Sequence, residues 1–364
     1  MKRNEIYDHI TTAFEDKFSF LGRQFAEEFQ MSCASYNIQT YSKPDFRMRR
    51  HLLLFWRAGW LKSSLLNKAN TLLGPQLCTI MSDVSNAALR GTVEGGSFVS
   101  PFTLKRPFSI CTEFGQVVSG FDSDIVQKLL NVLEEGLVTV SLGKIAYLSI
   151  DQREEATEKY GITFIDKNTF TYSTNWILIA GTYNKKFLFD NALESRFVIM
   201  HPEKKLDSNL TRHLTTSKKF HIDEDVAEHF KAEIVKDSPM DIAGIKLPNE
   251  VYECETPVSP RECAGLISFI ACRSWWNKPT TKDDIMEKLN QMKTRSETVW
   301  KTADDKVFDA IEFESKTVPD IASELDVSTR QVYYSLSSLK RKGIVNKFIE
   351  YDEEENATGK WKVV

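Results

Sequence analysis

The sequence predicts an α/β domain with a mostly parallel central sheet, followed by a helical segment and a small C-terminal module. From His51 onward, short apolar runs at 52–55, 108–111 and 176–180 alternate with helical patterns. This alternation is typical of a parallel sheet covered by helices. At 364 residues the chain is long enough for two or three domains.

Changes in the pattern set the expected boundaries. Ile6, Ile10, Phe14 and Phe18 repeat near helical spacing, which predicts an amphipathic N-terminal helix. Helical patterns alone follow the α/β core, and the last part begins with helices and ends in strand-like alternation. The expected parts are an N-terminal helical segment (1–45), an α/β core (46–202), a helical domain (203–297), a linker (298–303) and a C-terminal module (304–364).

Composition predicts a cytoplasmic protein without a metal cage or disulfides. The six cysteines are scattered without a Cys-x-x-Cys pair, and the six histidines lack a His-x-x-x-His spacing. No apolar run approaches the roughly 18 residues of a bilayer span, so we expect no membrane anchor. The formal net charge of −4 argues against wholesale wrapping of nucleic acid, so any DNA contact must be local.

A possible phosphate-binding loop follows the first apolar run, in the order strand, Gly59, Lys62, Ser63, helix. In such a loop backbone amides and the lysine meet phosphates, and the hydroxyl holds magnesium. Trp56 and Leu61 occupy the two glycine positions of the usual G-x-x-x-x-G-K-[ST] pattern. The stretch therefore predicts an ATP and magnesium site, with Ser63 as the metal ligand. A surface lysine before a helix-capping serine is the alternative.

Polar residues follow the second apolar run, at 108–111. Thr112-Glu113 stands where a nucleotide hydrolase carries Asp-Glu, the first acid for magnesium and the second to orient the attacking water. Glu113 is thus a candidate catalytic carboxylate. Because Thr112 is neutral, magnesium would be held mainly by Ser63 and the phosphates. An ordinary strand-end carboxylate is the alternative.

The third apolar run leads into Gly181-Thr182-Tyr183-Asn184, and α/β sheets bind ligands at the carboxyl ends of their strands. Asn184 or Thr182 could hold the attacking water. Arg196 follows soon afterwards in Ser195-Arg196-Phe197. A guanidinium offered to a γ-phosphate stabilises the transition state, and in ring ATPases the neighbouring subunit offers it. A surface arginine is the alternative.

These landmarks, in this order, resemble the AAA+ module of the minichromosome-maintenance (MCM) helicases over roughly residues 50–290. The resemblance implies an α/β AAA+ core with a helical lid, ATP and magnesium as ligands, DNA as partner and a hexameric homo-oligomeric ring. The matching stretches are Lys62-Ser63 (the P-loop end), Thr112-Glu113-Phe114 (Asp-Glu-Phe), residues 134–140 (the glutamate-rich helix end and presensor strand) and Ser195-Arg196-Phe197 (the arginine finger).

Three further stretches extend the resemblance. Residues 92–99 resemble the hairpin inserted into the second helix of this clade, and Gly143-Lys144 falls where the second pore hairpin carries its DNA-tracking lysine. Residues 258–261 resemble the start of the lid helix, which implies that Arg261 senses nucleotide. A solvent-facing turn lysine and a simple helix start at Pro260 are the alternatives.

The sequence also departs from the family. The loop glycines are missing, Thr112 replaces an acid, and extra residues 149–172 separate the presensor hairpin from the next strand. We expect no counterpart of the family's N-terminal zinc and oligonucleotide-binding domain, because little sequence precedes Lys62. These departures indicate a minimal, divergent form, as in archaeal plasmids or viruses.

The C-terminal module predicts three helices and a hairpin. Helices are expected at 304–314 and 318–325, and Ser328 is a natural N-cap for a third at 329–342. The buried stripe of the third helix would be Val332, Leu336 and Leu339. Residues 344–351 and 360–364 can then pair as a hairpin, with 352–359 at its tip, so the layout resembles a winged helix.

The third helix of this module carries aromatic and basic residues away from its buried stripe. Arg330, Tyr334, Lys340 and Arg341 are the residue types that meet phosphates and base edges in a recognition helix. The hairpin tip is acidic and should be repelled by DNA. A winged helix that docks on protein is the alternative.

We therefore expect an MCM-like AAA+ ATPase that binds DNA, acting as a helicase or replication initiator of a mobile genetic element. One alternative is a catalytically degenerate AAA+ protein that serves as a DNA-binding or scaffold factor. Another is a transcriptional regulator of the same ATPase clade.

Overall fold

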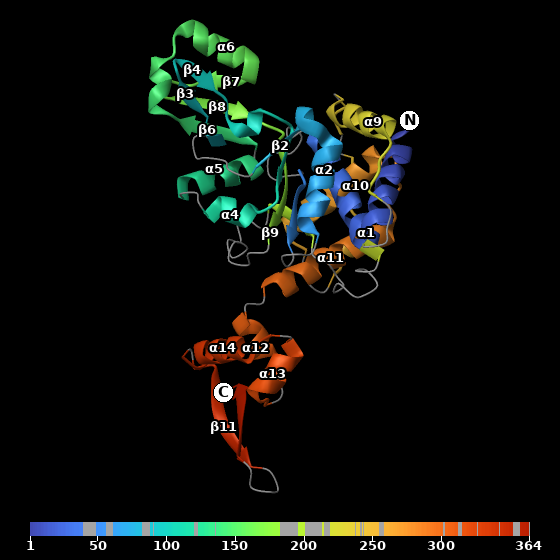
Figure 1. Ribbon diagram of the computed structural model, residues 1–364, viewed down its shortest axis with the longest axis vertical. Coiled ribbons are helices and arrows are strands. Elements are labelled where there is room, and N and C mark those ends of the chain that lie inside the picture. Colours follow the sequence, from blue (N-terminus) through green and yellow to red (C-terminus); the bar gives the residue numbers. More distant parts are fainter. Residues whose placement is uncertain are drawn as a thin grey trace. The chain divides into compact units, whose positions relative to one another are not determined.

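The computed structural model forms two units, Met1–Leu289 and Asn290–Val364 (Figure 1). Among the described residues, none of the helices is both long and apolar enough to cross a bilayer. The structure describes residues 1–38, 49–55, 61–81, 88–89, 91–119, 123–134, 136–182, 196–200, 213–214, 219–236, 238–240, 242, 244–254, 258–300, 303–311, 315–325, 327–341, 343–351 and 357–363.

A five-stranded parallel sheet forms the centre of the first unit, as predicted, in the order β10-β1-β9-β5-β2. The three middle strands are buried along their whole length, because helices cover both faces of such a sheet. In Figure 1, α2 lies on one side of β9, and α4 and α5 lie on the other. The strands are β1 (His51–Phe55), β2 (Cys78–Ile80), β5 (Phe108–Cys111), β9 (Ile177–Thr182) and β10 (Phe197–Met200).

Helices of the first unit cover this sheet. One hydrophobic cluster joins side chains of α1, α2, the sheet, α9 and α10. The helices of the first unit are α1 (Arg3–Ala34), α2 (Lys62–Leu77), α4 (Phe114–Ser119), α5 (Ser123–Glu134), α6 (Ile150–Tyr160), α9 (Glu224–Val235) and α10 (Pro260–Trp275), with 3-10 turns η1 (Ser35–Asn37), η3 (Phe102–Leu104), η4 (Gly143–Tyr147) and η6 (Asn249–Val251). The boundary between the two units falls within α11 (Lys282–Trp300).

The predicted N-terminal helix is confirmed, but it doubles back on itself. Ser19 has φ 56° and ψ −149°, which breaks the helix. Beyond it, the Gln30 amide donates to Tyr7 O at 3.3 Å and to Thr11 Oγ1 at 3.0 Å, contacts that a straight helix of this length does not allow. The predicted stripe of Ile6, Ile10, Phe14 and Phe18 is buried, and it lies inside this helical hairpin.

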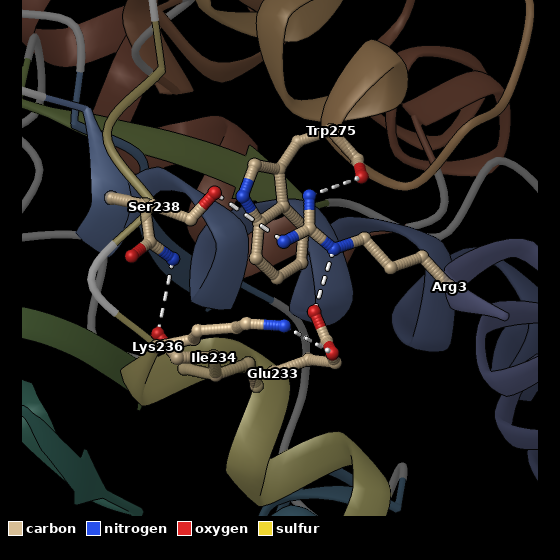
Figure 2. A network of polar contacts seen from close by, with 7 residues as sticks. Arg3, Glu233, Ile234, Lys236, Ser238 and Trp275 are labelled. Atoms are coloured by element: carbon tan, nitrogen blue, oxygen red, sulfur yellow. Dashed lines mark hydrogen bonds and ion pairs between the residues drawn. The ribbon is translucent and has the colours of Figure 1, made fainter. Parts of the chain in front are cut away.

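The amino end of α1 is fixed to α9 and α10 through Arg3 (Figure 2). Its Nε lies 2.7 Å from Glu233 Oε2, and its guanidinium stacks 4.0 Å from the Trp275 ring centre. It also donates to Ser238 Oγ and to the Trp275 carbonyl, both at 3.4 Å. These contacts tie the N-terminal segment to the helices of the 203–297 region.

The first unit also contains an antiparallel hairpin and a second, antiparallel sheet. The predicted hairpin at 92–99 is present as β3 (Thr92–Glu94) and β4 (Ser97–Val99). A second sheet has the order β6-β8-β7, from β6 (Leu137–Ser141), β7 (Ile162–Phe164) and β8 (Thr169–Ser173).

This second sheet corrects one expectation. Because β6 pairs directly with β8, the extra residues do not follow a completed hairpin: they lie between two paired strands and include most of the second one. Residues 149–172 contain α6, β7 and most of β8, and Lys144 lies in the 3-10 turn η4, just before them.

The second unit contains three helices and an antiparallel hairpin, close to the predicted positions. A bridge between Lys316 and Trp361 adds a third extended segment. Val332, Leu336 and Leu339 are buried, as predicted. The elements are α12 (Ala303–Ile311), α13 (Val318–Leu325), α14 (Thr329–Arg341), β11 (Val345–Tyr351) and β12 (Ala357–Val363).

A buried ionic cluster holds α1, β1 and α11 together. Glu28 is 7% exposed and accepts from Arg50 at 2.8 Å and from Lys288. Both cations also lie within 6 Å of the Phe269 ring centre, at 5.9 and 5.6 Å. One buried carboxylate thus compensates two buried cations, and its removal is costly because it leaves uncompensated charge in the interior.

We predict that Glu28→Ala lowers the free energy of unfolding of the first unit by about 3–5 kcal/mol. Urea unfolding followed by tryptophan fluorescence measures this, since Trp275 and Trp276 lie in the main hydrophobic cluster together with Phe269. The control is Glu15→Ala, whose carboxylate is exposed and 3.8 Å from Arg23, with an expected change within about 0.5 kcal/mol. Equal effects of the two substitutions would contradict the role of Glu28.

Candidate functional site

Three neighbouring parallel strands bring candidate residues to one edge of the sheet. In the register, Phe55 of β1 lies opposite Thr182 of β9, and Cys111 of β5 lies opposite Ala180. Because parallel strands end at the same edge, the segments that follow β1, β9 and β5 meet there. This carboxyl edge is where open α/β sheets bind ligands.

Lys62 begins α2 at this edge and is only 4% exposed. Its aliphatic stem crosses the end of β9, since a Cβ placed on Gly181 would lie 3.6 Å from Lys62 Cδ. Burial lowers the pKa of the Lys62 ammonium, whereas the negative charge of Glu113 acts in the opposite direction. The edge therefore holds a desolvated cation, which an arriving anion would stabilise.

The residue that precedes α2 has a positive φ although it is not a glycine. Leu61, the N-cap residue, has φ 67° and ψ −1° and no capping side-chain hydrogen bond. A left-handed conformation costs a non-glycine residue roughly 1–2 kcal/mol. Leu61 packs against the main hydrophobic cluster, which offsets part of that cost. Ser63 is exposed in the first turn, where its hydroxyl is accessible to a metal-bound phosphate.

Gly181 is a site residue that sequence reasoning did not single out. An added Cβ there would lie 3.0 Å from Leu66 Cδ1 and 3.1 Å from Thr112 O. A glycine at this point lets α2 and the segment after β5 approach β9 closely. The only sequence signal was a glycine directly after a buried apolar run.

Glu113 lies between the end of β5 and α4 and is half-buried. Its charge acts on Lys62, so the two groups share one environment. Thr182, at the end of the neighbouring strand, is buried. A lysine, a carboxylate and the uncapped start of a helix can together bind phosphates and orient water for attack.

Arg196 and Arg261 lie together, at the opposite edge. Phe197 pairs with His51, the first residue of β1, so Arg196 precedes β10 at the amino edge of the sheet. Its Nε lies 2.8 Å from Glu134 Oε2, and Arg261 Nη2 lies 3.6 Å from the same atom. The structure thus groups these two arginines with Glu134, while Lys62 and Glu113 lie at the carboxyl edge.

Arg261 lies in the first turn of α10, whose start matches the expectation. Ser259 caps the helix by accepting from Glu262 N at 3.2 Å, and Glu262 Oε2 accepts from Ser259 N at 2.7 Å. Pro260 occupies the first turn, where a backbone amide would have no acceptor within the helix, so proline loses no hydrogen bond there.

Three predicted site residues are not placed. Gly59 and Asn184 lie outside the described residues. Only the backbone of Lys144 is described, within η4. Within the described part of the chain, no group of three or more His, Cys, Asp or Glu side chains could hold a metal ion, and magnesium binding through Ser63 stays a prediction.

In the second unit, the predicted residues of α14 are exposed. Arg330, Tyr334, Ser337 and Arg341 follow one another at helical spacing along one face, and Lys340 is exposed beside them. The Arg330 guanidinium lies 5.7 Å from the Tyr334 ring centre and donates to its hydroxyl at 3.2 Å. The pair offers a cation and an aromatic edge together.

The chain matches no protein-family model and none of the curated proteins with which it was compared. Its function is therefore argued from the geometry of these two edges and of α14.

We predict that Lys62→Met stabilises the unliganded protein at neutral pH, because the folded environment disfavours the charged ammonium. The advantage over wild type should shrink as pH rises from the lowered pKa of Lys62 toward its ordinary value of 10.5, because wild type then loses the buried charge.

Paired urea unfolding curves at neutral and alkaline pH measure this difference. Lys105→Met is the matched control, since Lys105 is exposed. Its free energy of unfolding should show no pH-dependent gain over wild type. A Lys62→Met protein less stable than wild type at neutral pH would contradict the interpretation that burial disfavours the charge of Lys62.

Proposed function

We propose that the chain is a divergent, MCM-like AAA+ ATPase that binds ATP with magnesium and acts on DNA. The observation that carries the proposal is the buried Lys62 at the uncapped start of α2, beside Gly181 and within the electrostatic influence of Glu113. A desolvated lysine at a helix start is an arrangement that receives phosphate groups.

Each residue of the carboxyl edge has a role in this proposal. Lys62 and the free amides of α2 bind the terminal phosphates, and the Ser63 hydroxyl joins the phosphates in holding magnesium. Glu113 accepts a hydrogen bond from the attacking water and orients it toward the γ-phosphorus. Thr182 and Asn184 are the candidates to hold that water from the neighbouring strand.

The amino edge supports assembly into a ring, which we propose is hexameric. The five residues of β1 separate the two sheet edges by roughly 16 Å, farther than an arginine side chain extends. Arg196 and Arg261 therefore reach a phosphate only on another subunit. In this arrangement the amino edge of one subunit faces the carboxyl edge of the next, where Arg196 stabilises the transition state.

The second unit supports DNA as the partner. Its order of helix, extended segment, two helices and hairpin is that of a winged helix, and α14 presents Arg330, Tyr334, Lys340 and Arg341 at the surface. A helix of this composition suits the major groove. Lys144, in η4 of the first unit, is the candidate for a pore contact. The combination fits a cytoplasmic helicase or replication initiator of a mobile element.

A second candidate function is a catalytically degenerate AAA+ protein that binds DNA or serves as a scaffold. Thr112 favours it, because this neutral residue follows β5 where a magnesium-binding acid is expected. ATP hydrolysis with and without DNA separates the two candidates. Binding of ATP without turnover would favour the degenerate form. Absence of ATP binding would contradict both ATP binding and ATP hydrolysis at this site.

We predict that Glu113→Gln lowers the ATP hydrolysis rate by about 100-fold or more, because general-base contributions are typically of that size. ATP binding, measured by calorimetry, should persist because the amide retains the shape of the side chain. Glu154→Gln, at an exposed position of α6, is the control and should hydrolyse ATP like wild type. Unchanged turnover in Glu113→Gln would remove Glu113 from the mechanism.

We predict that Arg330→Ala weakens DNA binding about 3- to 10-fold and reduces the slope of log affinity against log salt by about 1, as expected for loss of one phosphate contact. Fluorescence anisotropy with a labelled duplex at several salt concentrations measures both quantities. Lys236→Ala removes the same charge from an exposed position of the first unit and should leave both unchanged. Identical behaviour of the two variants would favour a protein-docking role for α14.

A further inference from the structure

A tyrosine on α14 holds the guanidinium of Arg330 in one orientation. The Tyr334 hydroxyl lies 3.3 Å from Arg330 Nε and 3.2 Å from Arg330 Nη2, and it accepts a hydrogen bond from both nitrogens. The guanidinium carbon also lies 5.7 Å from the centre of the Tyr334 ring. The two residues are four positions apart, the spacing at which side chains meet along a helix. The Arg330 side chain therefore has a defined direction although it lies at the surface.

The two hydrogen bonds use one side of the guanidinium. Nε–H and one N–H of Nη2 point toward the Tyr334 hydroxyl, whereas the other N–H of Nη2 and both N–H groups of Nη1 remain. Among the residues that the structure describes, Arg330 has no further hydrogen bond or ion pair. The remaining donors form the end of the planar group, a fork that matches two acceptors lying side by side.

The position of Arg330 on α14 favours the edge of a base over a phosphate as its acceptor. Arg330 lies in the first turn of α14, whereas Lys340 and Arg341 lie in its last turn. At 1.5 Å per residue, the step from Arg330 to Lys340 is about 15 Å, which exceeds the roughly 12 Å width of the major groove. A helix that enters the groove with its first turn, as recognition helices do, therefore has its last turn beside the phosphates.

We propose that Arg330, held by Tyr334, reads a guanine in the major groove of DNA. This inference rests on the proposed function, because it requires α14 to bind DNA. Guanine is the base that presents two acceptors, O6 and N7, on its major-groove edge, and an arginine fork is their usual partner. Tyr334 is a positioning residue, whose hydroxyl directs the fork toward the base. Where no guanine is within reach, the same charge lies against the phosphates, which is the contact that Arg330→Ala removes.

The test compares three labelled duplexes of one alternating sequence, which contain guanine, 7-deazaguanine or inosine opposite cytosine. 7-Deazaguanine lacks the N7 acceptor, whereas inosine keeps both O6 and N7. In fluorescence anisotropy, the full chain should bind the guanine and inosine duplexes about 5-fold or more tightly than the 7-deazaguanine duplex, because a bidentate contact discriminates by at least this factor. Arg330→Lys keeps the charge but removes the fork, so this preference should disappear.

Two tyrosine variants distinguish a positioning role from general effects of the helix surface. Tyr334→Phe removes the hydroxyl that holds Arg330 and should reduce the preference for guanine over 7-deazaguanine about 3-fold or more, as expected for loss of an orienting hydrogen bond. Tyr333→Phe makes the same chemical change at the neighbouring residue, which is 52% exposed against 63% for Tyr334. The Tyr333 hydroxyl makes no hydrogen bond within the described part of the chain, so this variant should keep the preference of wild type.

Different results would contradict different statements. If the three duplexes bind equally while Arg330→Ala still reduces the salt dependence, Arg330 contacts only phosphates, and the inference is wrong although the proposed DNA binding stands. If Tyr334→Phe keeps the preference as Tyr333→Phe does, Tyr334 does not position Arg330. If Arg330→Ala and Lys236→Ala bind DNA alike, the proposed role of α14 in DNA binding fails, and this inference fails with it.

Discussion

The parallel pairing of β10, β1, β9 and β5 determines at which end of the sheet Lys62, Glu113 and Arg196 lie. Parallel strands all end at one edge, so Lys62 and Glu113 share an environment although they are far apart in sequence. The same pairing places Arg196 before the start of β10, at the opposite edge. The backbone pairing of the strands thus places one group of candidate residues at the carboxyl ends of the strands and another at their amino ends.

The surrounding helices bury that sheet. β1 is buried along its whole length, and the doubled α1 with α9 and α10 joins one hydrophobic cluster against it. The few charges in this interior, such as Glu28 with Arg50, are compensated. At Lys62, burial lowers the pKa of the ammonium by more than the charge of Glu113 raises it. A lysine whose pKa is lowered by burial is typical of a functional site.

Sequence patterns predicted the elements well because each depends on local periodicity. The apolar runs became β1, β5 and β9, and the stripe of Val332, Leu336 and Leu339 became the buried side of α14. Contacts between distant segments left no such signal. The tight packing at Gly181 requires Leu66 and Thr112, and the shared carboxylate of Glu134 requires two elements that follow it in the chain. The pairing of β6 with β8 across an insertion was missed for the same reason.

Leu61 shows why a departure from a motif need not mean a departure from its shape. The motif has glycine there because the chain enters α2 with positive φ, and Leu61 adopts that conformation. Packing of its side chain against the main hydrophobic cluster offsets part of the strain, so α2 begins after a positive-φ residue without a glycine. Thr112 is different, because no packing replaces a missing charge. In the proposed ATPase, turnover would depend more on Thr112 than on the absent glycine, so nucleotide binding and hydrolysis would be separable properties.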